Sequence, residues 1–281
     1  MQADQLRVPV GPGSMHVERF GHGGTAVILL HGFATSSFLW RNVAPAITEA
    51  GHTAYAVDLF GHGESDRPFD ADFGIAAQAE YLDAAMTALR VARAVLVGVD
   101  IGGDVALRLA ATRPERVEKI VLINTPAFDE IPAKDIIQMQ RSTARFAFRT
   151  TRGILGAAPL VEGILRKSVA DPEKHMPTRL VARYLAPFVG KDGTNHLLAL
   201  ASSISAEDLE DIDLRNIHVP VLILWGEEDT FVDGRIAEKL TSSLPDGRLV
   251  RLPGVARLLP EENPDYLGEL LMDFMRKRAV A

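Results

Sequence analysis

The residue with the most evident chemistry is Asp100. It stands at the centre of Gly98-Val99-Asp100-Ile101-Gly102, after an apolar run at 94–97 and before an Ala/Leu-rich segment. This spacing is typical of a nucleophile elbow, a sharp strand–turn–helix bend that projects the central side chain above a sheet. A carboxylate in that place attacks alkyl carbon and forms an ester that water must then cleave. The alternative interpretation is a helix-capping aspartate in a degenerate elbow.

The carboxyl-terminal third carries a second acid and an arginine. Asp229 follows the apolar run at 219–225, and Arg257 lies in the segment after the run at 248–252. No histidine occurs after His218, so no late histidine can act as a base. Arginine stays protonated at neutral pH and cannot replace one. If Arg257 lies between the two acids, we expect it to pair with one or both.

Composition excludes several classes of function. The chain has 281 residues, a formal net charge of -7, 47% hydrophobic residues and no cysteine. The charge offers no basic surface for nucleic acid, and the lack of cysteine excludes thiol catalysis and thiolate metal sites. No apolar run is long enough to cross a membrane. We expect a cytoplasmic protein without metal or cofactor; composition predicts no oligomeric state.

Short β-rich runs alternate with helical patterns, which predicts an α/β fold with a mostly parallel sheet between helices. Strands are expected at 26–30, 53–57, 94–97, 119–123, 219–225 and 248–252, and helices at 76–89, 103–112, 235–244 and 264–276. Residues 128–212 contain only helical patterns broken by prolines. They predict an inserted helical cap, with 1–127 and 213–281 forming the core.

Four motifs in this order resemble those of the alpha/beta-hydrolase superfamily, with its helical-cap members most similar. They are the elbow at Asp100, His31-Gly32-Phe33, the run at 58–66, and Trp225-Gly226-Glu227-Glu228-Asp229. The resemblance implies that Asp100 is the nucleophile and Asp229 the acid of the site. It implies that backbone N–H groups of Phe33 and Ile101 donate to an oxyanion. Arg257 then stands where related enzymes carry their catalytic histidine.

The resemblance also bears on the substrate. Dehalogenases of this superfamily hold halide with a tryptophan after the nucleophile, where this chain has Ile101. Epoxide hydrolases protonate the ring oxygen with a phenol of the cap, and Tyr184 is the one tyrosine of residues 128–212. We therefore expect a small to medium apolar substrate, an epoxide ahead of a haloalkane. The side chains expected to contact the substrate are Tyr184, Trp40 and Phe38; those expected to line the cap are Met139, Phe146, Phe148 and Phe188.

Two further functions stay open. Arg257 favours a pseudo-hydrolase that binds a small molecule in the inherited pocket without turnover. An esterase or lyase is a weaker alternative, because carboxylate attack on an ordinary ester would leave a mixed anhydride. For His31, we predict a structural role in bracing its loop by hydrogen bonds.

Overall fold

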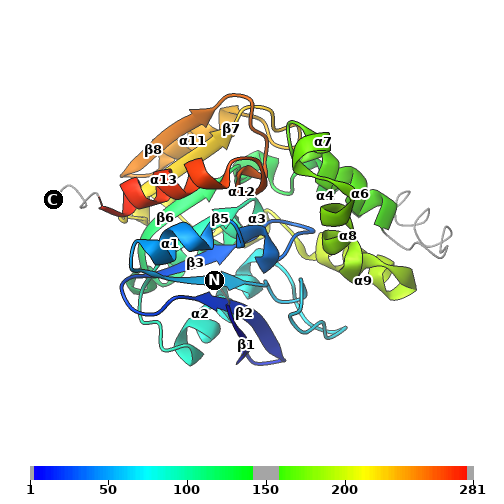
Figure 1. The fold of residues 1–281 in the computed structure, drawn as a ribbon, viewed down its shortest axis with the longest axis horizontal. Coiled ribbons are helices and arrows are strands. Elements are labelled where there is room, and N and C mark those ends of the chain that lie inside the picture. Colours follow the sequence, from blue (N-terminus) through cyan, green and yellow to red (C-terminus); the bar gives the residue numbers. More distant parts are fainter. Residues whose placement is uncertain (1–2, 142–157, 277–281) are drawn as a thin grey trace.

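The computed structural model describes residues 3–141 and 158–276, which build one eight-stranded sheet (Figure 1). The strand order is β1-β2-β4-β3-β5-β6-β7-β8. The strands are β1 (Asp4–Pro9), β2 (Ser14–Phe20), β3 (Ala26–Leu30), β4 (Thr53–Val57), β5 (Ala94–Val99), β6 (Val117–Ile123), β7 (Val221–Gly226) and β8 (Gly247–Leu252).

From β4 to β8 neighbouring strands are parallel. Strands β5 and β7 are buried along their whole length, as expected where helices cover both faces. The predicted α/β fold class and all six predicted strands are confirmed, with ends shifted by a few residues. The antiparallel hairpin β1–β2, which pairs through β2 with β4, was not predicted.

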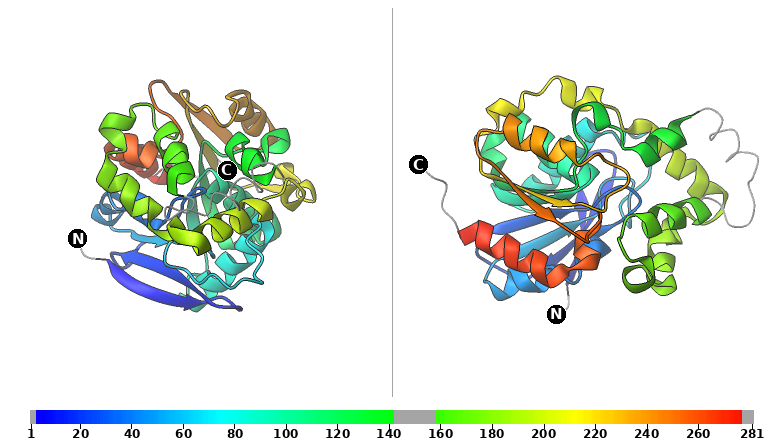
Figure 2. Two further views of the ribbon diagram at one scale, coloured as in Figure 1. Left: turned by 90° about the vertical axis from the view of Figure 1, so that its right-hand side faces the viewer. Right: turned by 90° about the horizontal axis from the view of Figure 1, so that it is seen from above.

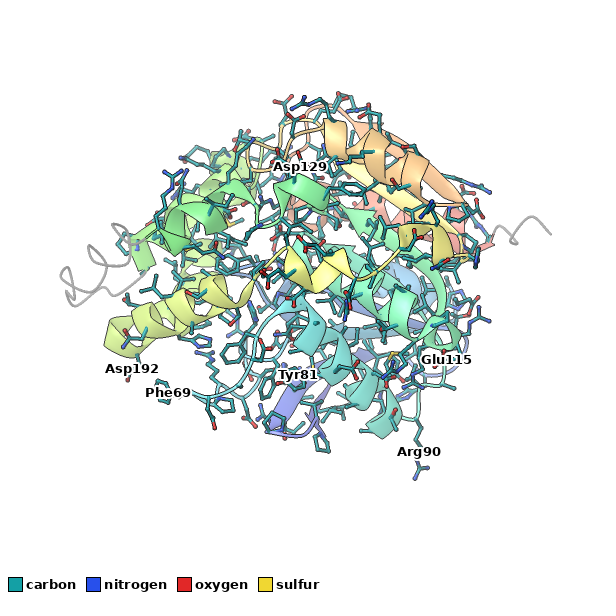
Figure 3. All side chains as sticks on the ribbon, turned by 180° about the vertical axis from the view of Figure 1, so that it is seen from behind. Phe69, Tyr81, Arg90, Glu115, Asp129 and Asp192 are labelled. Atoms are coloured by element: carbon teal, nitrogen blue, oxygen red, sulfur yellow. The ribbon has the colours of Figure 1, made fainter. Side chains whose placement is uncertain are left out.

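Helices cover both faces of the sheet. Helices α1 (Ala44–Glu49) and α13 (Pro264–Arg276) lie on one face, and α2 (Ile75–Ala88), α3 (Ile101–Thr112) and α11 (Arg235–Ser243) lie on the other (Figures 1 and 3). The four predicted helices are present. Because α3 begins at the carboxyl end of β5, it joins the elbow directly to the centre of the sheet.

The chain between β6 and β7 forms a group of helices beside the sheet, which we call the inserted helices (Figure 2). They comprise α4 (Lys134–Gln140), α6 (Ala158–Lys167), α7 (Pro172–His175), α8 (Thr178–Leu185), α9 (Gly190–Ser203) and α10 (Glu207–Glu210). Met139 and Phe188 are buried, whereas Phe146 and Phe148 lie outside the described residues. In the part of the chain that the structure describes, no helix is long and apolar enough to cross a membrane.

Candidate active site

Asp100 occupies a sharp turn between β5 and α3. Its backbone has φ 53° and ψ -126°, a conformation that non-glycine residues adopt only where surrounding structure enforces it. A Cβ on Gly98 would lie 2.4 Å from backbone atoms of Gly102, so only glycine allows strand and helix to approach this closely. The local geometry is that of the predicted elbow.

The two oxygens of the Asp100 carboxylate have different surroundings. The backbone N–H of Phe33 donates to Oδ2 at 2.9 Å. Oδ1 is buried and has no hydrogen-bond partner among the described residues. Ile101, the first residue of α3, is buried, and its role as an oxyanion donor stays a prediction. The backbone N–H of Phe33 therefore holds one oxygen, while the other has no hydrogen bond among the described residues.

Arg257 lies among three buried carboxylates. Its Nη1 is 3.6 Å from Oδ2 of Asp100 and 3.3 Å from Oδ2 of Asp135, and its Nε is 3.6 Å from Oδ2 of Asp229. All four side chains are almost completely buried. The guanidinium also lies over the ring of Phe231, 4.3 Å from its centroid. Arg257 thus contacts both predicted acids and a third acid from α4.

This charge balance changes the proton affinities of the cluster. Burial raises the pKa of Asp100; the Arg257 charge lowers it, and the charge of Asp135 raises it again, so that the net direction is upward. Burial alone would lower the pKa of Arg257, but the three carboxylates raise it above its usual value. Arg257 is therefore a permanent cation, and it cannot accept a proton from water.

Asp229 is oriented by the ends of β6 and β7. Its Oδ1 accepts the backbone N–H of Phe231 at 2.8 Å, and its Oδ2 accepts the side-chain amide of Asn124 at 3.1 Å. Asn124 in turn exchanges two hydrogen bonds with the backbone of Gly226. Since parallel strands end at the same edge of the sheet, this network fixes Asp229 beside Arg257.

His31 braces its loop, as predicted. Its Nε2 accepts the backbone N–H of Leu59 at 3.0 Å, so Nδ1 carries the proton and donates to the carbonyl of Gly32 at 2.8 Å. Both ring nitrogens are occupied. Burial lowers the pKa of His31, and the imidazole stays neutral and structural.

The three aromatic residues predicted to contact substrate have other partners. The hydroxyl of Tyr184 donates to Oε1 of Glu261 at 2.6 Å, and Arg41 binds the same carboxylate through two nitrogens at 2.6 and 2.7 Å. The Phe38 ring lies 5.9 Å from that of Tyr184. Trp40 is fully buried in the core. Tyr184 is thus hydrogen-bonded to Glu261, and the Phe38 ring packs between Tyr184 and the guanidinium of Arg41.

A groove of about 280 Å³ lies next to the Arg257 cluster. Asp135 and Phe231, which both contact Arg257, form one part of its lining. Other lining residues come from the inserted helices: Met139, Leu160, Ile164 and Lys167. The groove is mostly apolar and of a size that suits a small ligand.

Sequence reasoning missed three residues of the cluster. Asn124 could have been found, because a polar residue directly after a buried strand beside the elbow strand lies at the active edge of the sheet. Asp135 and Phe231 carry no such signal. They are an acid in a short helix and an aromatic residue in a loop, and only the tertiary structure brings them to Arg257. Among the described residues, no group of three or more potential ligands could hold a metal ion.

Comparison with known proteins places this geometry in a family. Residues 25–264 match the model of the alpha/beta hydrolase fold. A haloalkane dehalogenase of Bradyrhizobium diazoefficiens is 30% identical over 291 residues, which cover 93% of this chain and 91% of that protein. One of Mesorhizobium japonicum is 26% identical over 290 residues, covering 98% and 92%.

Solved structures agree on the fold. An epoxide hydrolase, CorEH, superposes with a TM-score of 0.82 at 21% identity and covers 98% of this chain and 99% of its own. The haloalkane dehalogenase DbeA from Bradyrhizobium elkani superposes with a TM-score of 0.76 at 24% identity, covering 98% of each chain. With the family model matched over most of its length, this chain belongs to the alpha/beta hydrolase fold family.

Proposed function

We propose that this protein is a hydrolase that uses Asp100 as a nucleophile on a small to medium apolar electrophile, an epoxide ahead of a haloalkane. The observation that carries the proposal is the asymmetry of the Asp100 carboxylate. Among the described residues Oδ1 has no hydrogen-bond partner and can attack, while the Phe33 N–H holds Oδ2, which becomes the carbonyl oxygen of the ester. A donor fixed on that oxygen also stabilises the oxyanion that forms when water attacks the ester.

Relatives and the groove support the same chemistry. Haloalkane dehalogenases are among the similar sequences, and an epoxide hydrolase is among the similar structures. In our proposal, the inserted helices form a cap and the groove at Asp135 and Phe231 admits the substrate. Its apolar lining favours an uncharged organic electrophile over a charged one.

Arg257 should impair the second half-reaction. Hydrolysis of the ester needs a base to deprotonate water, and a guanidinium with three carboxylate neighbours stays protonated. Esterification removes the negative charge of Asp100, which leaves Arg257 balanced by Asp135 and Asp229. We therefore propose that the ester forms faster than it is hydrolysed, and that it accumulates.

Intact-mass spectrometry after exposure to panels of epoxides and haloalkanes tests this function. We expect the mass of one substrate molecule to be added by an epoxide, and the modified peptide to contain Asp100. Asp100→Asn should abolish the adduct, whereas Asp129→Asn, an exposed matched control, should retain it. An adduct that persists in Asp100→Asn would sink the assignment of the nucleophile.

A binding protein without turnover is the second candidate. The observation that favours it is the position of Arg257, which contacts Asp100, Asp135 and Asp229 together. Such a cluster would hold Asp100 in place and reduce its nucleophilicity. Reversible, saturable binding of the same compounds without any covalent adduct would support this alternative.

A further inference from the structure

Asp104 is a further buried carboxyl group near Asp100, in addition to Asp135 and Asp229. It lies in the first turn of α3, four residues after Asp100, and its side chain is fully buried. Neither of its oxygens has a hydrogen-bond partner among the described residues. A buried carboxyl group without partners is costly to the fold and calls for an explanation.

The orientation of α3 places Asp104 away from the sheet. A Cβ on Gly102 would lie 2.6 Å from the carbonyl oxygens of Leu30 and His31, so this side of α3 faces the strands. Residues three and four apart share a helix face. Arg108, one turn after Asp104, donates to the carbonyl of Asp208 in α10. The face that carries Asp104 is thus the one that the inserted helices cover.

The surroundings of Asp104 favour the neutral form of its carboxyl group. Burial raises its pKa well above the usual value, and the negative charge of Asp100 raises it further. An isolated carboxylate in such surroundings would be strongly unfavourable, whereas the neutral acid is tolerated. In its neutral form Asp104 is an O–H donor, and it lies one helical turn along α3 from the carboxylate that we propose as nucleophile.

Epoxide opening needs such a donor, because breaking the C–O bond places negative charge on the ring oxygen. A haloalkane needs none, since halide leaves as a stable anion. The phenol predicted for this role belongs to Tyr184, and its O–H already donates a hydrogen bond to Glu261. A different acid must then protonate the oxygen.

We propose that Asp104 is the acid that protonates the epoxide oxygen when Asp100 opens the ring; this rests on the function proposed above. Oδ1 of Asp100 forms a bond to an epoxide carbon, and the C–O bond of the ring breaks. The released electron pair on oxygen takes the proton of Asp104. The products are a hydroxyalkyl ester of Asp100 and an ionised Asp104, so charge and atoms balance. The substrate class of the site is accordingly epoxide.

The test compares single-turnover modification of Asp100 in wild type, Asp104→Asn and Asp211→Asn. Asp211 is exposed and pairs with Arg108, which lies on α3 as Asp104 does. Asp211→Asn is therefore a matched acid-to-amide control. The reagents are 1,2-epoxyhexane and 1-iodohexane, and the adduct is mapped by peptide mass. We expect Asp104→Asn to slow epoxide modification about a hundredfold or more, as for loss of a general acid, while alkylation by 1-iodohexane changes little. Asp211→Asn should match wild type with both reagents.

A second measurement does not depend on activity. The infrared difference between wild type and Asp104→Asn at neutral pH should contain the carbonyl band of a neutral carboxylic acid. Epoxide modification at wild-type rate in Asp104→Asn, or absence of that band, would overturn the role of Asp104 while leaving Asp100 as nucleophile. Modification of Asp100 by 1-iodohexane but not by 1,2-epoxyhexane would also overturn it. Absence of any adduct at Asp100 with either reagent would overturn the proposed function itself.

Discussion

The Arg257 guanidinium contacts three carboxylates in this site. A substitution of any one of these four residues therefore changes the charge balance of the other three. Arg257 with Asp229 was predictable from the positions of both residues after the predicted strands at 248–252 and 219–225. The contribution of Asp135 was not, because the approach of α4 to the core depends on tertiary packing. Arg257→His alone would leave the buried Asp135 without its cation, and breaking a buried ion pair typically costs about 3–5 kcal/mol.

The double variant Arg257→His/Asp135→Asn should therefore gain multiple turnover. Histidine can deprotonate water at neutral pH, and Asp229, already oriented by Asn124 and the Phe231 N–H, can orient its ring. We expect at least a tenfold rise in steady-state epoxide hydrolysis, measured as diol release. Asp135→Asn alone is the control and should not gain turnover. If the double variant folds but gains nothing, the binding-protein alternative is favoured.

The pH dependence of ester formation follows from the raised pKa of Asp100. Only the ionised carboxylate attacks, so the single-turnover rate should rise with pH through a value above the usual range of aspartate. Asp135→Asn removes a neighbouring charge that raises this pKa, and its profile should shift to lower pH. Rates from a pH series of intact-mass time courses check this; identical profiles would show that Asp135 does not affect Asp100.

At the scale of elements, the parallel centre of the sheet was predictable because its strands are continuous apolar runs. The β1–β2 hairpin was not predicted, because the apolar alternation of β1 is limited to Leu6 and Val8 and most of this strand is exposed. Its place is fixed by long-range contacts. Asp58, directly after β4, accepts the Nδ1–H of His16 in β2 at 2.8 Å and the backbone N–H of Glu64 at 2.8 Å.

Asp58 should increase the free energy of unfolding at neutral pH and contribute less at acidic pH. Burial would raise its pKa, but the hydrogen bond from His16 and two backbone donors lower it to about 2. Because this pKa is lower in the folded protein, the ionised carboxylate stabilises the fold at pH values above the unfolded pKa of 3.8. The stabilisation is lost as the pH falls towards 2. Asp58→Asn should lose about 2 kcal/mol in free energy of unfolding at pH 7, since one pKa unit is about 1.4 kcal/mol.

Urea unfolding at pH 7 and pH 3 measures this difference, with the exposed Asp70→Asn as control. The difference in free energy of unfolding between wild type and Asp58→Asn should be smaller at pH 3 than at pH 7. A difference that does not change with pH would contradict the coupling between Asp58 ionisation and stability.

Tyr184 should stabilise the contact between two helices through its hydrogen bond to Glu261. It joins α8 to Glu261 in α12 (Leu259–Glu262), which Arg41 also binds. Tyr184→Phe should lower the free energy of unfolding by about 1.5–3 kcal/mol, the usual contribution of a hydrogen bond to a charged group. Thermal or urea unfolding measures it, with the more exposed Tyr266→Phe as control. Unchanged stability together with a hundredfold loss of epoxide opening would instead restore the ring-opening role predicted from the sequence.

At the scale of the whole molecule, the motifs from His31 to Asp229 were sufficient to predict the fold, because each marks the end of a buried strand. They were less informative about the reaction. The substrate class depends on which proton donors lie near Asp100, and the engagement of Tyr184 by Glu261 and the burial of Asp104 arise only when the inserted helices meet the core.

We propose that Asp100 forms an ester that this chain hydrolyses slowly. The most direct test follows ester and diol together, by intact mass and product analysis, after mixing wild type with excess 1,2-epoxyhexane. We predict that ester approaches one equivalent per chain on the Asp100 peptide, while diol stays well below one equivalent over the same period. Rapid release of many equivalents of diol by the unmodified protein would show that another group activates water, and would contradict the account given for Arg257.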